Sequence, residues 1–164
     1  RYLRSALDRE VARARRFRED FSIIMLDVDH LKSYNDIHGH LQGSEVLRRL
    51  AQVVMGELRA SDVLAKYGGD EFVVILPQTE RDGARTVAER IRAAVEAHEF
   101  PGEGDGMKIT TSMGISQFPE DGETTRELLE FADNSLYQAK RTGRNRVSIA
   151  SAGPSSPEGI GDAG

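Results

Sequence analysis

The sequence predicts an α+β sandwich, in which helices cover a mostly antiparallel sheet. Segments with helical spacing of apolar residues alternate along the chain with short apolar runs that are typical of strands. Two of these runs are separated by Gly68-Gly69-Asp70-Glu71, and Gly-Gly between apolar runs is typical of a hairpin. Because a hairpin requires an antiparallel strand pair, a doubly wound parallel sheet is disfavoured. The chain has no Walker A motif and no Gly-x-Gly-x-x-Gly after its first strand, which excludes those two phosphate-binding loops.

Length and composition indicate one domain. The chain has 164 residues, enough for a single domain with a sizeable core. The absence of Cys excludes a disulfide-stapled module, a Cys-ligated zinc site and a thiol nucleophile. The formal net charge of −5 argues against a protein that coats nucleic acid, so we expect no DNA or RNA partner.

The same sequence argues against a membrane protein. No apolar run approaches the ~20 residues of a membrane span, and no signal peptide opens the chain. We therefore expect a cytoplasmic domain without membrane contacts of its own, even where the full-length protein is tethered to a membrane sensor. The chain begins at Arg1 rather than Met, from which we expect it to be a piece of a longer protein.

Residues 1–20 predict a helix with one narrow apolar stripe. The segment is highly charged, contains neither Gly nor Pro, and carries apolar residues at helical spacing, namely Leu3, Leu7, Val11, Ala14 and Phe17. The stripe can pack on its own domain or against a second copy of the chain, and the first arrangement is favoured.

The segment after this helix predicts a strand and two helices. Phe21–Leu26 is a nearly continuous apolar run that ends at Asp27, which is typical of a buried central strand. Leu31–Gly39 predicts a short helix, for which Asp29 is a candidate N-cap. In Ser44–Leu58 the apolar residues recur at helical spacing, which predicts an amphipathic helix.

The remaining elements follow from the same patterns. Helical spacing recurs in Ala84–Val95 and in Arg126–Arg141. The expected strands are Val63–Tyr67, Phe72–Leu76, Met107–Phe118 and Val147–Ala150. Pro101–Gly106 is expected to be a loop. Residues 151–164 have no core-forming pattern and are expected to be a disordered tail.

Two acidic clusters lie at predicted strand ends, Asp27-Val28-Asp29 after the first strand and Asp70-Glu71 in the hairpin turn. If the first strand pairs beside the hairpin, Asp27 and Asp70 converge, and hard oxygen ligands at close range are what Mg²⁺ requires. Metal-bound carboxylates suit phosphoryl transfer, because the metal neutralises charge and activates the attacking oxygen. The alternative is that these acids are solvated caps of turns.

Three basic side chains, Lys32, Lys140 and Arg144, are candidates for holding phosphates. Lys140 and Arg144 are four residues apart, so one helical face that continues past the helix end would present both. The alternative is that these two cations only complement the helix dipole.

Four separated motifs resemble those of the GGDEF family, the bacterial diguanylate cyclase domains. Tyr67-Gly68-Gly69-Asp70-Glu71-Phe72 contains the motif that names the family. The segment that begins at Asp27 resembles the family's Asp-x-Asp-x-Phe-Lys-x-x-Asn-Asp, and it is followed by Gly39-His40-x-x-Gly43. The family's C-terminal helix signature is matched by Leu136-Tyr137-x-Ala139-Lys140-x-x-Gly143-Arg144-Asn145. The resemblance covers residues 1–150 and implies a catalytic domain at 21–150 after the N-terminal helix.

The resemblance implies the palm-like fold of nucleotidyl cyclases and polymerases, and an enzyme that condenses two nucleoside triphosphates into a cyclic dinucleotide. It implies two Mg²⁺ or Mn²⁺ ions per active site, held by Asp27, Asp70 and the backbone carbonyl of Val28. Asp70 would be the general base for the ribose 3′-hydroxyl, Glu71 would assist metal or proton handling, and Lys32 would stabilise charge on the phosphates. The other implied substrate contacts are Lys140 and Arg144 for the terminal phosphates, Asn35 for the purine edge, and His40, Ser44, Gly68 and Gly69.

The resemblance also implies partners. Family members act as homodimers in which each subunit presents one nucleoside triphosphate to the other. This implies a second role for residues 1–20, as the signalling helix through which a missing upstream sensor aligns two copies of the chain. Arg59-Ala60-Ser61-Asp62 resembles the family's Arg-x-x-Asp inhibitory site for the cyclic dinucleotide product, with Arg90 as a further contact. The alternative for Arg59 and Asp62 is a surface ion pair of little energetic weight.

One residue departs from the family pattern. After Gly43 the family usually has Asp, whose carboxylate only accepts hydrogen bonds, whereas the hydroxyl of Ser44 donates or accepts. This change removes a charge-assisted contact to guanine and predicts a site that takes ATP beside GTP, as in the promiscuous subgroup that makes 3′,3′-cyclic GMP-AMP beside cyclic di-GMP. The alternatives are a strict GTP-only diguanylate cyclase, in which Asn35 alone selects guanine, and a non-catalytic receptor for cyclic di-GMP or GTP.

Overall fold

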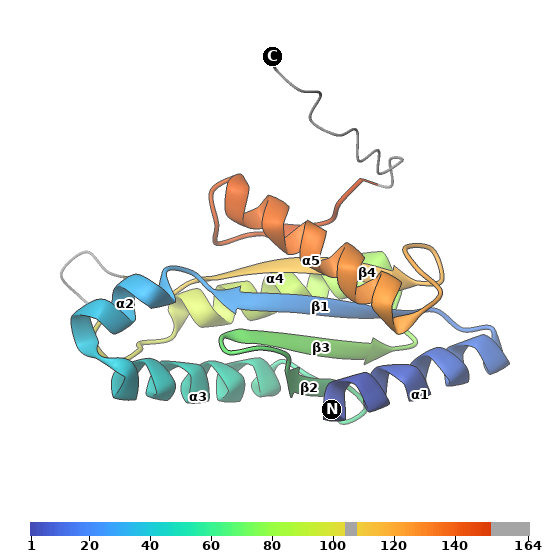
Figure 1. Ribbon diagram of the computed structural model, residues 1–164, viewed down its shortest axis with the longest axis horizontal. Coiled ribbons are helices and arrows are strands. Elements are labelled where there is room, and N and C mark those ends of the chain that lie inside the picture. The colour runs from blue at the N-terminus through green and yellow to red at the C-terminus, as the bar shows by residue number, and fades with distance from the viewer. Residues whose placement is uncertain (104–107, 152–164) are drawn as a thin grey trace, which may run out of the picture.

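The computed structural model describes residues 1–103 and 108–151, and its elements follow the predicted order. They are α1 (Tyr2–Phe17), β1 (Phe21–Val28), α2 (Leu31–His38), α3 (His40–Gly56), β2 (Val63–Lys66), β3 (Glu71–Pro77), α4 (Arg81–Ala97), β4 (Thr111–Phe118), α5 (Thr125–Arg141) and β5 (Val147–Ser148). The strands form one sheet in the order β2-β3-β1-β4-β5 (Figure 1). β4 and β5 pair in parallel and the other neighbours are antiparallel, so the predicted α+β class is confirmed.

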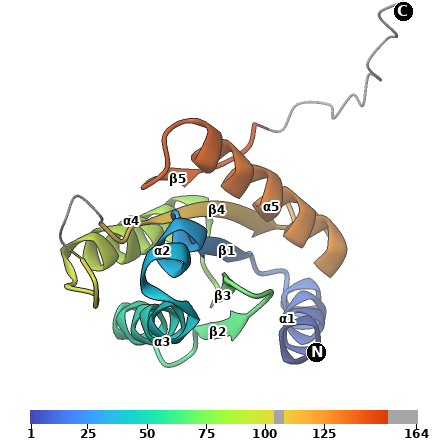
Figure 2. The ribbon, with the colours of Figure 1, turned by 60° about the vertical axis from the view of Figure 1, so that its left-hand side comes forward.

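Helices cover both faces of the sheet. Figure 2 shows α3 and α4 on one side of the strands and α1 and α5 on the other. The central strand β1 supplies both cores, because alternate residues of a strand point to opposite faces. Ile24 and Leu26 pack with α2, α3 and α4, whereas Ile23 and Met25 pack with α1 and α5. A strand buried on both faces explains why the sequence of β1 is a nearly continuous apolar run.

Helix α1 packs on its own domain. Leu3, Leu7, Val11 and Ala14 are buried in the core that α1 shares with α5, which is the first of the two arrangements open to the apolar stripe. The stripe is therefore not available to a second copy. The expectation that Phe17 continues the stripe is wrong, because 57% of its surface is exposed and the helix ends at this residue.

Several expected boundaries are corrected by the structure. Helix α3 begins at His40 rather than Ser44, because the positive φ of Gly39 (85°) ends α2 and the next residue already starts a new helix. β4 begins at Thr111 rather than Met107, and β5 has two residues rather than the four of Val147–Ala150. Residues 104–107, and the expected tail apart from Ser151, lie outside the described residues.

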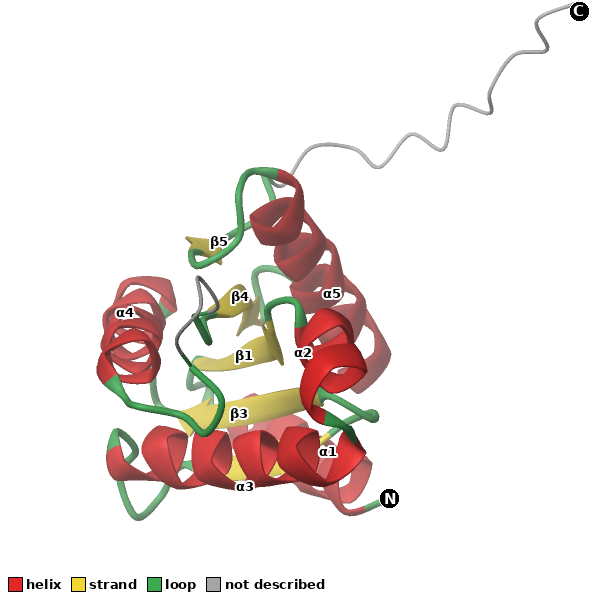
Figure 3. Cartoon of the chain, turned by 90° about the vertical axis from the view of Figure 1, so that its left-hand side faces the viewer, coloured by secondary structure: helices red, strands yellow, loops and turns green. Residues whose placement is uncertain are grey.

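Asp29 is not the N-cap of α2, which corrects another expectation. The N-cap residue is His30, in a left-handed conformation with φ 58° and without a side-chain cap hydrogen bond. The carboxylate of Asp29 is buried instead against the segment that leads into β4. Helix α2 lies at the end of the sheet where β1 stops (Figure 3). Within the described residues, no helix has the length and apolar character needed to cross a membrane.

Candidate active site

The strand order brings the two acidic clusters together. β1 pairs directly with β3, and the register places Asp27 opposite Glu71, the first residue of β3. Asp70 precedes Glu71 in the exposed hairpin turn, so the expected convergence of Asp27 and Asp70 occurs at the end of the sheet where β1 stops and β3 begins. Residues far apart in the sequence thus supply one cluster of carboxylates.

The surroundings of these carboxylates favour their protonated forms. Burial raises the pKa of Asp27, and the nearby charges of Asp70 and Asp29 raise it further, while Lys140 opposes the shift. Burial likewise raises the pKa of Glu71, and the charges of Asp27 and Asp133 add to the effect. Like charges held close together disfavour ionisation unless a cation compensates them. Neighbouring acids therefore add to burial in opposing the ionisation of both carboxylates.

Lys140 supplies part of the compensating charge. Its Nζ donates a hydrogen bond to Oδ2 of Asp27 from the last turn of α5, and both side chains are mostly buried. Beside this pair lies a shallow cavity of about 190 Å³, lined by Glu71, Asp133, Asn134, Leu136, Tyr137 and Lys140. The sequence indicated a phosphate-binding role for Lys140 but did not reveal its ion pair with Asp27, because the two residues are far apart along the chain.

The residues present fit a divalent cation that is bound in part by substrate. No three His, Cys, Asp or Glu side chains of the described segments are grouped as a protein-only metal site. Mg²⁺ does not need such a cage, since it is commonly held by one or two carboxylates together with substrate phosphates. Asp27 and Asp70 supply two carboxylates, and Val28 lies next to them at the end of β1. Burial and the neighbouring carboxylates raise the pKa values of Asp27 and Glu71, so a cation bound here would stabilise their ionised forms.

The other phosphate-binding candidates lie on two different segments. Lys32 is exposed in the first turn of α2. Arg144 is exposed in the loop after α5, where its φ of 63° is left-handed and its N–H donates to the carbonyl of Ala139. The idea that one helical face continues past the helix end to present Lys140 and Arg144 is wrong, because Gly143 and Arg144 have positive φ values of 130° and 63°.

The candidate base-binding residues lie where α2 meets α3. The amide of Asn35 packs on Gly43, where an added Cβ would lie 1.8 Å from Oδ1 of Asn35. That oxygen is buried and has no hydrogen-bond partner among the described residues. Ser44 follows Gly43 in α3 and is exposed, and His40 is exposed at the start of the same helix. Ser44 also lines a cavity of about 280 Å³ between α3 and the strands β2 and β3, together with Leu47, Arg48, Ala51, Lys66 and Phe72.

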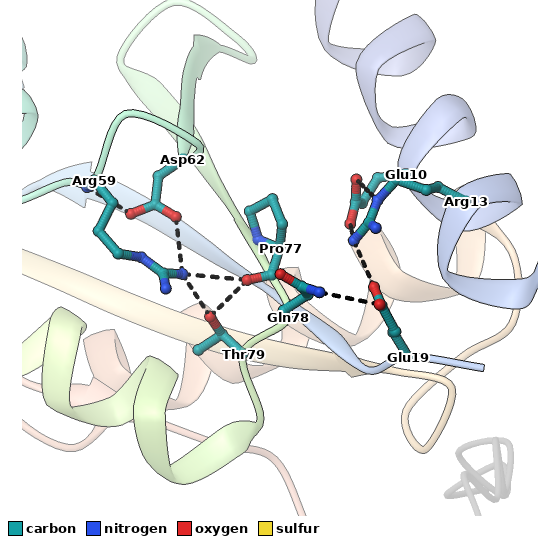
Figure 4. Close-up of polar contacts among 8 residues, drawn as sticks. All are labelled: Glu10, Arg13, Glu19, Arg59, Asp62, Pro77, Gln78 and Thr79. Atoms are coloured by element: carbon teal, nitrogen blue, oxygen red, sulfur yellow. Dashed lines mark hydrogen bonds and ion pairs between the residues drawn. The ribbon is translucent and has the colours of Figure 1, made fainter. Parts of the chain in front are cut away.

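Arg59 and Asp62 form a hydrogen-bonded turn between α3 and β2 (Figure 4). The backbone N–H of Arg59 donates to Asp62 Oδ2 at 2.8 Å, and its Nη2 donates to Oδ1 at 3.3 Å. The same Nη2 donates to the carbonyl of Pro77 and to Oγ1 of Thr79. Asp62 is almost fully buried and Arg59 is exposed, so the pair is an ion pair with one solvent-facing cation.

Arg90 approaches the same region from α4. Its Nη2 donates to the backbone carbonyl of Glu57 at 2.9 Å, two residues before Arg59 in the chain. Arg59, Asp62 and Arg90 therefore lie around one surface, on the face of the sheet covered by α3 and α4. Figure 4 also shows that Gln78 donates to Glu19, which pairs with Arg13 and so ties the neighbouring turn to α1.

Comparison with known proteins identifies relatives of the whole domain. Residues 1–146 match the family described as "Diguanylate cyclase, GGDEF domain". The chain is 43% identical over 148 residues to the diguanylate cyclase DgcP of Pseudomonas aeruginosa, which covers 90% of the chain and 22% of that relative. It is 40% identical over 133 residues to diguanylate cyclase A of Treponema denticola, covering 81% of the chain and 36% of the relative. The chain thus spans about a fifth to a third of the length of these curated relatives.

A solved structure agrees with this assignment. The active GGEEF domain of a diguanylate cyclase from Vibrio cholerae superposes with a TM-score of 0.86 and 32% identity, covering 93% of this chain and 96% of that chain. The α+β fold, the convergent acidic turn and the family match therefore agree. The chain belongs to the GGDEF domain family of diguanylate cyclases.

Proposed function

We propose that the chain is the catalytic domain of a cyclic-dinucleotide synthase. The observation that carries the proposal is the placement of Asp27 beside Asp70 and Glu71, with Lys140 paired to Asp27 at the end of α5. In the reaction, the 3′-hydroxyl oxygen of one nucleoside triphosphate bonds to the α-phosphorus of another. Pyrophosphate leaves, and the hydroxyl proton passes to a base. A second, reciprocal step closes the ring, so two triphosphates yield one cyclic dinucleotide and two pyrophosphates.

The residues of the cluster divide the work as follows. Asp70 accepts the proton of the 3′-hydroxyl, and Glu71 beside it assists. Asp27, Asp70 and the carbonyl of Val28 hold Mg²⁺ or Mn²⁺, for which we propose two ions, and bound metal supplies charge neutralisation at the phosphates. Lys32, Lys140 and Arg144 bind the phosphates, and the exposed turn Gly68-Gly69 lets the triphosphate approach the backbone without a Cβ in the way.

A second copy of the chain completes this reaction, because each subunit holds one nucleoside triphosphate. The apolar stripe of α1 is buried in its own domain, so the proposed homodimer uses other surfaces of the chain. Residues 1–20 remain the proposed route from an upstream sensor, acting through their rigid attachment to the domain rather than by forming a coiled coil with a second helix.

Arg59, Asp62 and Arg90 form the proposed product-inhibition site. A GGDEF domain of DgcB from Caulobacter crescentus was solved in complex with c-di-GMP.

The proposed substrates are GTP and ATP, and the proposed products are cyclic di-GMP and 3′,3′-cyclic GMP-AMP. Ser44 is exposed and follows Gly43, on which the unpartnered amide oxygen of Asn35 packs, and an Asp at this position would supply a carboxylate that only accepts hydrogen bonds. Ser44 neither rewards the N–H donors of guanine with a charged acceptor nor repels the lone pair of adenine N1. In this proposal the contact from Asn35 does not by itself exclude adenine.

The test of this function is product analysis with Mg²⁺ and equal GTP and ATP, on protein fused to a dimerising coiled coil. We expect mixed cyclic GMP-AMP beside cyclic di-GMP, and we expect Ser44→Asp to reduce ATP incorporation by on the order of 10-fold. Ser5→Asp adds the same charge to an exposed helical serine on the opposite face of the sheet and serves as control. Cyclic di-GMP alone would contradict the relaxed selectivity, and no product from the enforced dimer would favour the receptor.

A glycine substitution tests the base-binding surface. Gly43→Ala is expected to raise the KM for nucleotide by on the order of 10-fold, because its Cβ displaces the amide of Asn35. Gly56→Ala, in the same helix, has no atom within 4 Å of its Cβ and is the matched control. It should leave the KM unchanged and stabilise the fold by about 0.4–1 kcal/mol, because Ala restricts the unfolded chain more than Gly does. Steady-state kinetics and thermal melts of both variants measure these effects. Equal KM values for Gly43→Ala and Gly56→Ala would mean that Asn35 is not part of the nucleotide site.

A further inference from the structure

Asp29 is a buried carboxylate that the proposed chemistry does not use. It follows β1 directly, two residues after Asp27, and only 3% of its surface is exposed. Three donors from two distant segments converge on it. Thr110 Oγ1 donates to Oδ2 at 2.7 Å, Ser112 Oγ donates to Oδ1 at 2.6 Å, and the backbone N–H of Asn145 donates to Oδ2 at 3.0 Å. A buried carboxylate with this many donors is held in one orientation.

The contact with Asn145 fixes an unusual stretch of backbone. Gly143, Arg144 and Asn145 have φ values of 130°, 63° and 46°, three successive residues in the left-handed half of conformational space. Side chains other than Gly disfavour this conformation, so it persists only where surrounding contacts impose it. Arg144 N–H donates to Ala139, and Asn145 N–H donates to Asp29. The two backbone donors are thus anchored on different elements.

The other side of this loop is also tied down. Arg92 Nη1 on α4 donates to Oδ1 of Asn145 at 3.2 Å, so the side chain of Asn145 is held as well as its backbone. Arg144, between these anchors, has an exposed side chain. The loop therefore presents Arg144 in a direction set by the end of β1, the same strand end that carries Asp27.

We propose that Asp29 is a positioning residue, which orients the loop carrying Arg144 relative to Asp27 and so aligns the phosphate-binding cation with the acidic cluster. The proposal rests on the proposed function in that Arg144 binds the nucleotide phosphates. Asp29 touches neither substrate nor metal in this assignment. Asp29 acts by accepting a hydrogen bond from the backbone N–H of Asn145. The hydrogen bonds from Thr110 and Ser112 hold the carboxylate of Asp29 in the orientation that this contact needs.

Two substitutions of Asp29 distinguish a retained acceptor for the Asn145 N–H from a lost one. Asp29→Asn is nearly isosteric, and its carbonyl oxygen can accept from Thr110 and Asn145 while its amide donates to the hydroxyl of Ser112, which can turn to accept. Asp29→Ala removes the acceptor of the Asn145 N–H altogether. We therefore expect Asp29→Asn to retain the position of the loop and Asp29→Ala to lose it. Asp29→Ser, whose hydroxyl is too short to reach all donors, replaces Asp29→Ala should that variant not fold.

The experiment measures loop order and nucleotide affinity in the full chain. Amide hydrogen exchange at Asn145 should become faster in Asp29→Ala and stay slow in Asp29→Asn. The Kd for a non-hydrolysable GTP analogue should rise by on the order of 10-fold in Asp29→Ala only. Ser22→Ala is the control for a general loss of stability, because it removes a buried hydrogen bond to the carbonyl of Thr79 at the opposite end of β1 from Asp29. It should lower the melting temperature without changing the Kd.

A double-mutant cycle with Arg144→Ala identifies the route of the effect. If Asp29 acts through Arg144, Asp29→Ala should weaken binding no further once Arg144 is removed. An equal additional loss in that background would overturn the proposal, as would unchanged exchange at Asn145 in Asp29→Ala. Both readouts are independent of turnover. Failure of the proposed function would instead appear as an absence of product from the unsubstituted, dimerised protein.

Discussion

Asp70→Asn is expected to lower product formation by about 10³-fold in the enforced dimer, without lowering the melting temperature. General bases contribute typically about 10²–10⁴-fold, and this change also neutralises one of the two carboxylates proposed to hold the metal. Stability should be unaffected because Asp70 is exposed in the hairpin turn and its side chain makes no hydrogen bond within the described segments. The loss of one negative charge beside Asp27 relieves repulsion rather than creating it.

The experiment on Asp70 compares initial rates of cyclic-dinucleotide formation with thermal melts of the same samples. Asp82→Asn is the matched control, since Asp82 is an exposed aspartate in the first turn of α4, away from the acidic cluster. It should retain full activity. Activity of Asp70→Asn within a few-fold of the unsubstituted protein would exclude Asp70 as the base, and would direct the same test to Glu71.

Gly114→Ala is expected to destabilise the fold by about 3 kcal/mol or more. An added Cβ would lie 2.3 Å from the backbone N of Leu136 and 2.4 Å from the backbone O of Ala132. Both are backbone atoms of α5 and cannot move without displacing the helix. Gly114 also pairs with Met25 in β1 and with Ser148 in β5, so β4 cannot retreat from α5 without straining the sheet.

Urea unfolding followed by circular dichroism measures the effect of Gly114→Ala. At this chain length the loss corresponds to a melting temperature lower by roughly 6–12 °C. Gly56→Ala again serves as control, because the same added methyl group meets no atom within 4 Å. A free-energy change below about 0.5 kcal/mol for Gly114→Ala would mean that α5 does not lie as close to β4 as in this structure.

Gly114 illustrates which features of the fold can be predicted from the sequence alone. Gly114 lies within a run of β-forming residues, where its local effect is to weaken a strand. Its function in the fold depends on α5, which begins eleven residues later and packs across β4. The sequence predicts both elements from their periodicity, but it does not show how closely they approach.

The order and type of the elements, the apolar faces of most helices and the four family motifs were all predictable from the sequence. These features depend on local periodicity and on short motifs, which can be recognised from neighbouring residues in the chain. The tertiary structure decided how distant residues combine: α1 covers its own domain, Lys140 pairs with Asp27, and Asp29 holds the loop of Arg144 instead of capping α2. Each of these is a contact between segments far apart in the chain. The spacing of residues along the chain specifies such contacts only after the strand order and the helix packing are known.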